Sequence, residues 1–413
     1  MKLQAAQTNS KKKLLYVMGI DWNWIYQRPQ IIAEYLSRDY EVTVVYPVKL
    51  WDTPAARRRK KEALRYLRIW TLPFQRKLKV AGWAADRYGS LLLKICRHYQ
   101  YVYIDYPSYI KYIPADYAGC LIYDCIDDHA QMCASEKIRS EIEKTEQEAV
   151  LRSSLLVVSS MKLKRRIEEQ SGGRKAVLVR NGTDFRKVYD AKESCIKGKY
   201  TIGYIGTIAE WFDEDLLVKS AGEHPELTYH LIGPCMDISL TAHRGISYEG
   251  VVEHGRLQSH IKDYDCLIMP FVVNEIVKSV DPVKLYDYIA FGKCIVSVWY
   301  EELKHFEDYV YFYRTYEEYD QLMRELIRTG FPPKYNVHQQ ENFLDENSWQ
   351  ERYGMIVEAI RQTDRERQTA DESNECIRNQ TGGNQNVSAG KRTGTGSGGR
   401  KRGVPDGAAS GNA

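Results

Sequence analysis

The chain has 413 residues, of which 43% are hydrophobic and 28% charged, and its formal net charge is +4. This composition is typical of a globular protein with about two to three domains, and it excludes the fibrous and disordered classes. No apolar run approaches the ~18 residues that a transmembrane helix requires, and we expect no signal peptide. The nine cysteines include no C-x-x-C pair, so we expect free thiols in a reducing cytoplasm and no zinc site.

Short apolar runs alternate with helix-compatible sequence through the first half of the chain. A helix is predicted over 29–38, and strands are predicted at 14–19, 41–46, 101–104, 120–123 and 155–158. Continuous apolar strands separated by helices indicate a parallel sheet that is covered on both faces.

The same pattern restarts at residue 200, with strands predicted at 200–205, 227–232, 266–269 and 293–298 and a helix over 210–222. Each half opens with a strand, a glycine turn and a tryptophan. We therefore predict an α/β protein with two Rossmann-like domains in tandem. The predicted division is 12–185, 198–344, a C-terminal helix within 345–362, and a tail, 363–413, whose lack of Phe, Trp, Tyr and Leu predicts disorder.

The segment 277–293 is a candidate anion site. Pro282 suits the first turn of a helix, where free backbone amides and the positive end of the helix dipole attract anions. Lys278 and Lys284 add cations, and Asp287 could accept a hydrogen bond from a ribose. An ordinary capped helix is the alternative interpretation.

A cluster of acids follows the strand predicted at 120–123. Asp127, Asp128 and His129 lie where open α/β sheets bind ligands, and they could act as a base, as metal ligands or as acceptors for sugar hydroxyls. Helix capping is the alternative for the two aspartates. The D-x-D pattern at 213–215 is better explained as the first turn of a helix, so no metal is predicted. Neither glycine turn is G-x-G-x-x-G, which gives no support to a dinucleotide cofactor.

The segment 57–79 is strongly basic, with aromatic and aliphatic side chains between the cations. Such a pattern favours contact with an anionic membrane surface. A solvated basic face and a nucleic-acid partner are the alternatives, and we do not expect nucleic acid.

Several segments together resemble bacterial GT-B glycosyltransferases of family 4, in particular the branch with teichuronic-acid, capsule and exopolysaccharide enzymes. The likeness covers about residues 12 to 362. The segments that carry it are Asp21–Trp22, Tyr26–Gln30, Tyr123–Asp128, Asn181–Asp184, Gly203–Gly206, Glu210–Asp213 and Pro282–Gly292.

The resemblance implies a nucleotide-sugar donor held by the second domain, an acceptor held by the first, and a C-terminal helix that crosses back to the first domain. It implies retention at the anomeric carbon without an enzyme nucleophile, and no cofactor. The implied catalytic residues are Asp127, Lys284 and Asp287. The implied donor site comprises Gly206, Thr207, Lys278, Ser279, Val280, Pro282, Val283, Lys284 and Asp287. The implied acceptor side of the cleft comprises Gly19, Asp21, Trp22, Arg28 and Asp128.

The chain departs from the family pattern near the expected diphosphate. Many relatives have two glutamates where this chain has Ser279 and Asp287, and the usual cations after the second glycine turn are replaced by acidic and aromatic residues. The candidates that would compensate for the diphosphate charge are Lys278, Lys284 and Arg28.

These observations predict a cytoplasmic glycosyltransferase, peripheral on the inner face of the plasma membrane. It would transfer a sugar from a nucleoside-diphosphate donor to a saccharide carried on a polyprenyl diphosphate. Two alternatives remain open: a GT-B sugar-nucleotide epimerase, and a catalytically silent GT-B scaffold of a polysaccharide assembly complex.

Overall fold

The chain divides into two compact units, Met1–Thr363 and Asp364–Ala413, and the first of them contains both β-sheets. No helix among the residues described is long and apolar enough to cross a membrane. The residues that the computed structural model describes are 11–49, 61–71, 78–190, 195–236, 240, 242–252 and 254–382.

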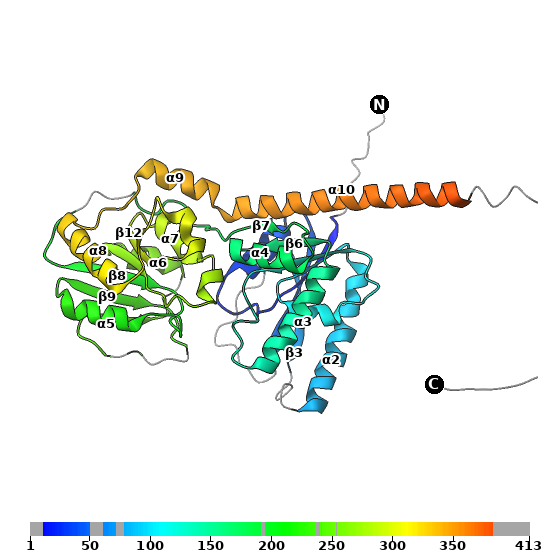
Figure 1. Ribbon diagram of the computed structural model, residues 1–413, viewed down its shortest axis with the longest axis horizontal. Coiled ribbons are helices and arrows are strands. Elements are labelled where there is room, and N and C mark those ends of the chain that lie inside the picture. The colour runs from blue at the N-terminus through cyan, green and yellow to red at the C-terminus, as the bar shows by residue number, and fades with distance from the viewer. Residues whose placement is uncertain are drawn as a thin grey trace, which may run out of the picture. The chain divides into compact units, whose positions relative to one another are not determined.

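The first sheet has seven parallel strands in the order β3-β2-β1-β4-β5-β6-β7 (Figure 1). The strand order reverses between β1 and β4, and ligands of open α/β sheets bind at such a point, beyond the carboxyl ends of the strands. The strands are β1 (Lys13–Val17), β2 (Glu41–Lys49), β3 (Leu64–Thr71), β4 (Tyr101–Ile104), β5 (Cys120–Cys125), β6 (Leu155–Val158) and β7 (Val177–Leu178).

Both faces of the first sheet are buried, which explains why its strands are continuous apolar runs. On β1, Leu14 and Tyr16 belong to one core, whereas Leu15 and Val17 belong to the other. Side chains of α1 (Arg28–Leu36) and of the first turns of α10 (Trp349–Gly382) complete the first core. The opposite core is completed by α2 (Lys79–Leu93), η1 (Lys94–His98), η2 (Pro107–Tyr112), α3 (Glu136–Arg152) and α4 (Met161–Gln170).

The second sheet has six parallel strands in the order β10-β9-β8-β11-β12-β13. Its strands are β8 (Tyr200–Ile205), β9 (Leu227–Ile232), β10 (Ile246–Gly250), β11 (Cys266–Met269), β12 (Cys294–Val298) and β13 (Tyr311–Tyr313). One hydrophobic core joins this sheet to its helices. These are α5 (Glu214–Glu223), α6 (His254–His260), η3 (Val277–Ser279), α7 (Val283–Ala290), η4 (Glu301–Phe306), α8 (Tyr316–Thr329) and α9 (Val337–Glu346).

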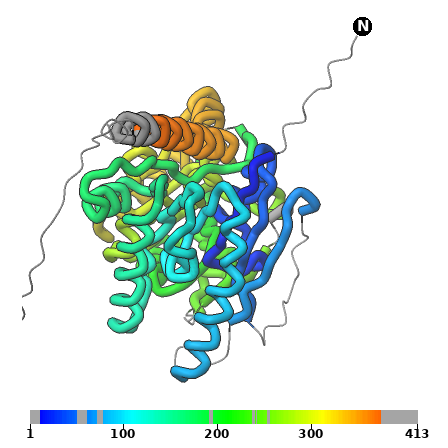
Figure 2. The backbone as a smooth tube through the Cα atoms, turned by 90° about the vertical axis from the view of Figure 1, so that its right-hand side faces the viewer, coloured from blue at the N-terminus to red at the C-terminus, as the bar shows by residue number. Residues whose placement is uncertain are grey.

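Within the segment 57–79, which is predicted to contact an anionic membrane surface, the described residues include the strand β3 and the start of α2. Residues 64–71 form the edge strand β3, in which Leu64 and Ile69 are buried on opposite faces of the sheet, one in each core, while Arg65 and Arg68 are exposed. Residues 57–60 and 72–77, which carry most of the other cations, lie outside the described residues. Lys79 begins α2, whose N-terminal turns extend beyond the neighbouring elements in both views (Figures 1 and 2).

The prediction of disorder from residue 363 is wrong for residues 363–382, which continue α10. The segment has no Phe, Trp, Tyr or Leu, but it is rich in Glu, Gln and Arg, which favour a helix without any core. At its other end α10 is well packed, because Trp349, Tyr353, Ile356 and Ile360 are buried in a core of the first sheet. Residues 383–413 lie outside the described residues.

Candidate functional site

The glycine turn after β8 lies against Lys284 of α7. Gly206 has a φ of +148°, which favours glycine, and a Cβ at this position would lie 2.6 Å from Cε and 3.1 Å from Nζ of Lys284. The ammonium also lies 4.8 Å from the ring centroid of Phe271 and 5.6 Å from that of Tyr204. The structure therefore brings together two predicted donor-binding elements that are about 80 residues apart in the sequence.

Lys284 and Asp287 form a pair of titratable groups on α7 with perturbed pKa values. Burial lowers the pKa of Lys284 from 10.5 to about 8, although the negative charge of Asp287 opposes this change. Burial raises the pKa of Asp287 from 3.8 to about 7, against a hydrogen bond from Thr183 and the charge of Lys284. Such displaced pKa values, at the carboxyl edge of a parallel sheet, are typical of a site that binds a charged ligand.

The other members of the predicted donor site have mixed positions. Lys278 is exposed and pairs with Glu275 at 2.7 Å, and Ser279 donates its hydroxyl to the carbonyl of Ile276 at 2.7 Å. Each side chain thus has a local partner, and its predicted role at the donor stays a prediction. The remaining predicted members are at the glycine turn or the start of α7; they are Thr207, Val280, Pro282 and Val283.

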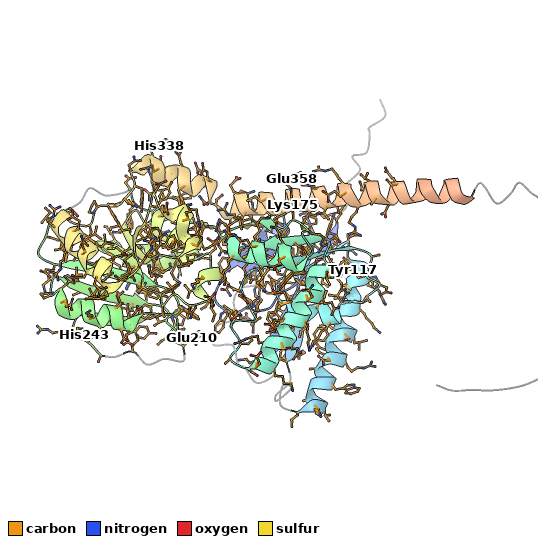
Figure 3. The ribbon with its side chains drawn as sticks, in the orientation of Figure 1. Tyr117, Lys175, Glu210, His243, His338 and Glu358 are labelled. Atoms are coloured by element: carbon orange, nitrogen blue, oxygen red, sulfur yellow. The ribbon has the colours of Figure 1, made fainter. Side chains whose placement is uncertain are left out.

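The departure from the family pattern after β8 has a structural explanation in part. Asp213 is the N-cap of α5 and accepts a hydrogen bond from the amide of Leu216 at 3.0 Å, as predicted for the D-x-D pattern. Glu210 is exposed in the turn that precedes α5 (Figure 3). Neither acid is a partner of Lys284.

At the edge of the first sheet, an unpredicted acid lies at the centre of the predicted acceptor side. Asp105, which follows β4, accepts a hydrogen bond from the amide of Gly19 at 2.6 Å, and its carbonyl lies 3.2 Å from Nε2 of His129. Its Oδ2 is buried and has no hydrogen-bond partner among the residues described. Burial raises its pKa to about 7. The signal was available in the sequence, since Asp105 directly follows the strand predicted at 101–104.

Asp127 has a raised pKa because it is shielded from water, and His129 and Arg28 partly offset this effect. Asp128, by contrast, accepts a hydrogen bond from the amide of Gln131 at 3.3 Å within a turn, and since α3 begins only at Glu136, neither aspartate caps a helix. Of the two adjacent acids, Asp127 is thus the better candidate for chemistry. Within the described part of the chain, no group of three or more His, Cys, Asp or Glu side chains could hold a metal ion.

Three residues predicted to line the acceptor side have structural contacts instead. Arg28 is buried and donates to both oxygens of Asp124, at 3.0 and 3.1 Å, so its charge is already compensated and it is not placed to serve a diphosphate. Trp22 is buried in the core against the ring of Tyr66, with 4.9 Å between ring centroids. Asp21 accepts hydrogen bonds from the backbone and side chain of Asn23 within its own turn, at 2.8 and 3.0 Å.

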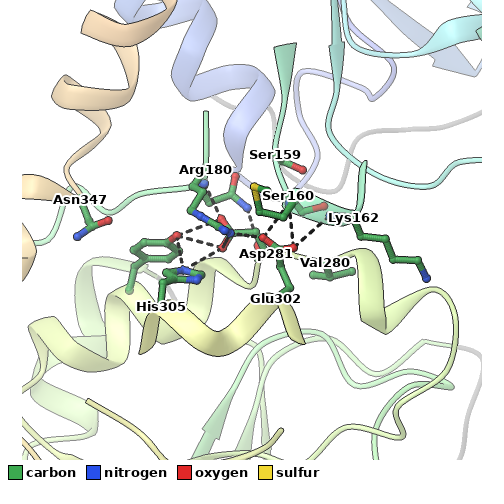
Figure 4. Close-up of polar contacts among 12 residues, drawn as sticks. Ser159, Ser160, Lys162, Arg180, Val280, Asp281, Glu302, His305 and Asn347 are labelled. Carbon is green, nitrogen blue, oxygen red and sulfur yellow. Dashed lines mark hydrogen bonds and ion pairs between the residues drawn. The ribbon is translucent and has the colours of Figure 1, made fainter. Parts of the chain in front are cut away.

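A buried polar network connects elements of the two sheets (Figure 4). Asp281, which precedes α7, accepts a hydrogen bond from the amide of Asn181 at 2.6 Å and forms an ion pair with Arg180 at 3.6 Å. Arg180 also pairs with Glu302, whose two carboxylate oxygens accept hydrogen bonds from the amide of Met161, the first residue of α4, at 2.9 and 3.0 Å. Burial of the carboxylate acts to raise the pKa of Asp281, but contacts with His305 and Arg180 keep this pKa below its usual value.

Comparison with solved structures establishes the fold. The HepE protein of Anabaena, solved with UDP and glucose, has a TM-score of 0.61 at 12% identity, and the match covers 84% of this chain and 99% of HepE. The lipopolysaccharide outer core galactosyltransferase WaaB has a TM-score of 0.59 at 11% identity, with 84% of this chain and 99% of WaaB covered. The chain therefore has the predicted α/β GT-B fold, with two Rossmann-like domains.

Sequence comparison adds one relative. No family model matches the chain. A protein of Bacillus subtilis (strain 168), whose assigned name is teichuronic acid biosynthesis glycosyltransferase TuaH, is 25% identical over 197 residues, which is 43% of this chain. The chain spans about half the length of this curated relative, since the match covers 50% of it.

Proposed function

We propose that the protein is a glycosyltransferase that transfers a sugar from a nucleoside-diphosphate sugar to a saccharide acceptor in cell-surface polysaccharide biosynthesis. The single observation that carries the proposal is the position of Lys284, whose partly desolvated ammonium lies over the Gly206 turn beside Asp287. A diphosphate at this turn would pair with the ammonium, and a ribose hydroxyl would bind the carboxylate. The names of TuaH and WaaB, and the UDP in HepE, support this assignment.

In the proposed reaction the anomeric C–O bond to the diphosphate breaks, and a bond to an acceptor hydroxyl forms. Negative charge develops on the leaving diphosphate, where the Lys284 ammonium and the positive end of α7 would stabilise it. The acceptor hydroxyl loses a proton, and Asp127 is the residue we assign to receive it or to orient the hydroxyl. We propose retention at the anomeric carbon, as the family resemblance implies, and no cofactor beyond the nucleotide sugar.

The proposed acceptor is a saccharide on a polyprenyl diphosphate, which places the enzyme on the anionic inner face of the plasma membrane. The outward face of α2 supports this part of the proposal. Val80, Trp83 and Leu91 are 79%, 65% and 67% exposed on one stripe of the helix. Cations lie along the same helix and just after it, at Lys79, Arg87 and Lys94. Exposed aromatic and aliphatic side chains flanked by cations are typical of helices that lie at a lipid interface. Eight of the nine cysteines are recorded as free thiols, which fits a reducing compartment.

The proposal is tested by binding and turnover measured on the full chain. Isothermal titration with UDP, GDP and their sugar derivatives should detect one nucleotide class, and Lys284→Met should weaken its binding about 10- to 100-fold by removing a charge-assisted contact. Lys278→Met is the matched control, because that lysine is exposed and paired with Glu275. Binding of no nucleotide would refute the donor site. Binding without sugar transfer or hydrolysis would instead favour the scaffold.

A further inference from the structure

Thr183 contacts the carboxylate proposed to bind the donor's ribose. Its hydroxyl donates a hydrogen bond to Oδ1 of Asp287 at 2.6 Å, across 104 residues of sequence. Thr183 is buried, at 2% exposure, and Asp287 is partly exposed. One carboxylate oxygen is therefore bound by Thr183, which lies in the crossover, the chain segment that connects the two sheets. The second oxygen is the one through which a ribose hydroxyl would bind.

The backbone of Thr183 is held in place on both sides by the chain segment 347–349, at which α10 begins. Its amide donates to the carbonyl of Asn347 at 3.1 Å, and its carbonyl accepts from the amide of Trp349 at 3.2 Å. A Cβ on the preceding Gly182 would lie 2.7 Å from the Asn347 carbonyl oxygen, so the two crossover segments are in close contact. The Thr183 hydroxyl thus has a defined position when it meets Asp287.

The hydrogen bond affects both the charge and the direction of the carboxylate. A donated hydrogen bond favours the ionised form, so Thr183 lowers the pKa of Asp287 against burial and against the nearby Asp184. Lys284, one turn earlier on α7, acts in the same direction as Thr183. Asp184 itself accepts a hydrogen bond from the hydroxyl of Tyr35 at 2.7 Å. Without the hydroxyl of Thr183, Asp287 would keep its proton to a higher pH and lose one fixed contact.

We propose that Thr183 is a positioning residue for donor binding, which orients the Asp287 carboxylate toward the ribose of the nucleotide. This inference rests on the donor site of the proposed function. It adds that the crossover between the two sheets, and not the donor domain alone, determines how tightly the ribose is bound. The side chain does not contact the reacting atoms, and its effect passes entirely through Asp287.

The test compares a hydroxyl-free variant with one that keeps the hydroxyl. Thr183→Val has nearly the same shape as threonine, and Thr183→Ser is the matched control. Binding of UDP and of 2′,3′-dideoxy-UDP is measured by titration calorimetry between pH 6 and pH 8.5, or with the two guanine nucleotides where only GDP binds. The ratio of the two dissociation constants isolates the ribose contact at each pH, because ionisation of the diphosphate affects the binding of both nucleotides equally.

Thr183→Val should weaken UDP binding about tenfold and leave 2′,3′-dideoxy-UDP binding unchanged, whereas Thr183→Ser should remain within about twofold. The ribose preference should also appear at a higher pH in the valine variant, and Asp287→Asn should abolish any effect of Thr183→Val. Equal weakening of both nucleotides would overturn the proposal, since that result indicates only a structural contact. Wild-type protein that binds neither UDP nor GDP would refute the donor site itself, which is a distinguishable result.

Discussion

Replacement of Lys284 by methionine should make the ligand-free protein more stable while it impairs donor binding. The pKa of this ammonium is lowered from 10.5 to about 8, with burial as the main cause. Since one pKa unit corresponds to about 1.4 kcal/mol, the charge disfavours the folded state by about 3 kcal/mol at pH 7. Lys284 remains partly exposed and Asp287 loses a favourable neighbour in the variant, so we expect a gain of about 1–2 kcal/mol.

The size of the stability gain depends on pH in a defined way. Below pH 8 the lysine is charged in both the folded and the unfolded protein, and the variant has its full advantage. Between pH 8 and pH 10.5 the folded wild type releases its proton first, so the advantage should disappear. Urea unfolding at pH 7 and at pH 10.5 measures both limits.

Lys278→Met is the control, because an exposed lysine paired with Glu275 should change the unfolding free energy by less than about 0.5 kcal/mol. A Lys284→Met protein that is less stable than wild type at pH 7 and binds nucleotide normally would refute the reasoning. In that case the ammonium would be a structural cation without a function at the Gly206 turn.

Three further predictions concern the first sheet and α2. Arg28→Gln should lower the unfolding free energy by about 3–5 kcal/mol in urea denaturation, because it leaves Asp124 buried without its ion-pair partner. Asp105→Asn should flatten the pH dependence of stability, since a pKa raised to about 7 makes wild type lose stability as the pH rises from about 4 to 7. Trp83→Ser should weaken sedimentation with vesicles that contain phosphatidylglycerol at least about threefold, whereas Val251→Ser, equally exposed in the second domain, should not.

Each of these predictions has a result that contradicts it. An Arg28→Gln protein of wild-type stability would show that the buried pair contributes little. An unchanged pH profile for Asp105→Asn would mean that this carboxyl does not titrate near neutrality. Equal vesicle binding by the two serine variants would remove α2 as a lipid contact.

The strands were the most predictable part of the fold. Parallel strands that are covered on both faces are continuous apolar runs, and those at 101–104, 155–158 and 200–205 occur as predicted. The strand β3 was missed because its exposed Arg65 and Arg68 belong to a longer basic segment, and only Leu64 and Ile69 of its eight residues are buried. The short strands β7 and β13 carry too few residues to show a pattern.

The donor side of the site was easier to predict than the acceptor side. Lys284 and Asp287 lie one turn apart on a helix, so their common location followed from local sequence. The sequence showed that Arg28 belongs to the family segment Tyr26–Gln30, but it could not identify the partner of this side chain. Asp124 is 96 residues away, and the pairing depends on packing. The contact between Thr183 and Asp287 likewise joins residues 104 positions apart, so no local sequence pattern could predict it.

The central claim is tested most directly by a crystal structure of the protein with the nucleotide that it binds. We predict that the diphosphate lies at the Gly206 turn within hydrogen-bond distance of Nζ of Lys284, and that a ribose hydroxyl donates to Asp287. A nucleotide bound elsewhere, with Lys284 and Asp287 in the positions described here and free of ligand, would contradict the account.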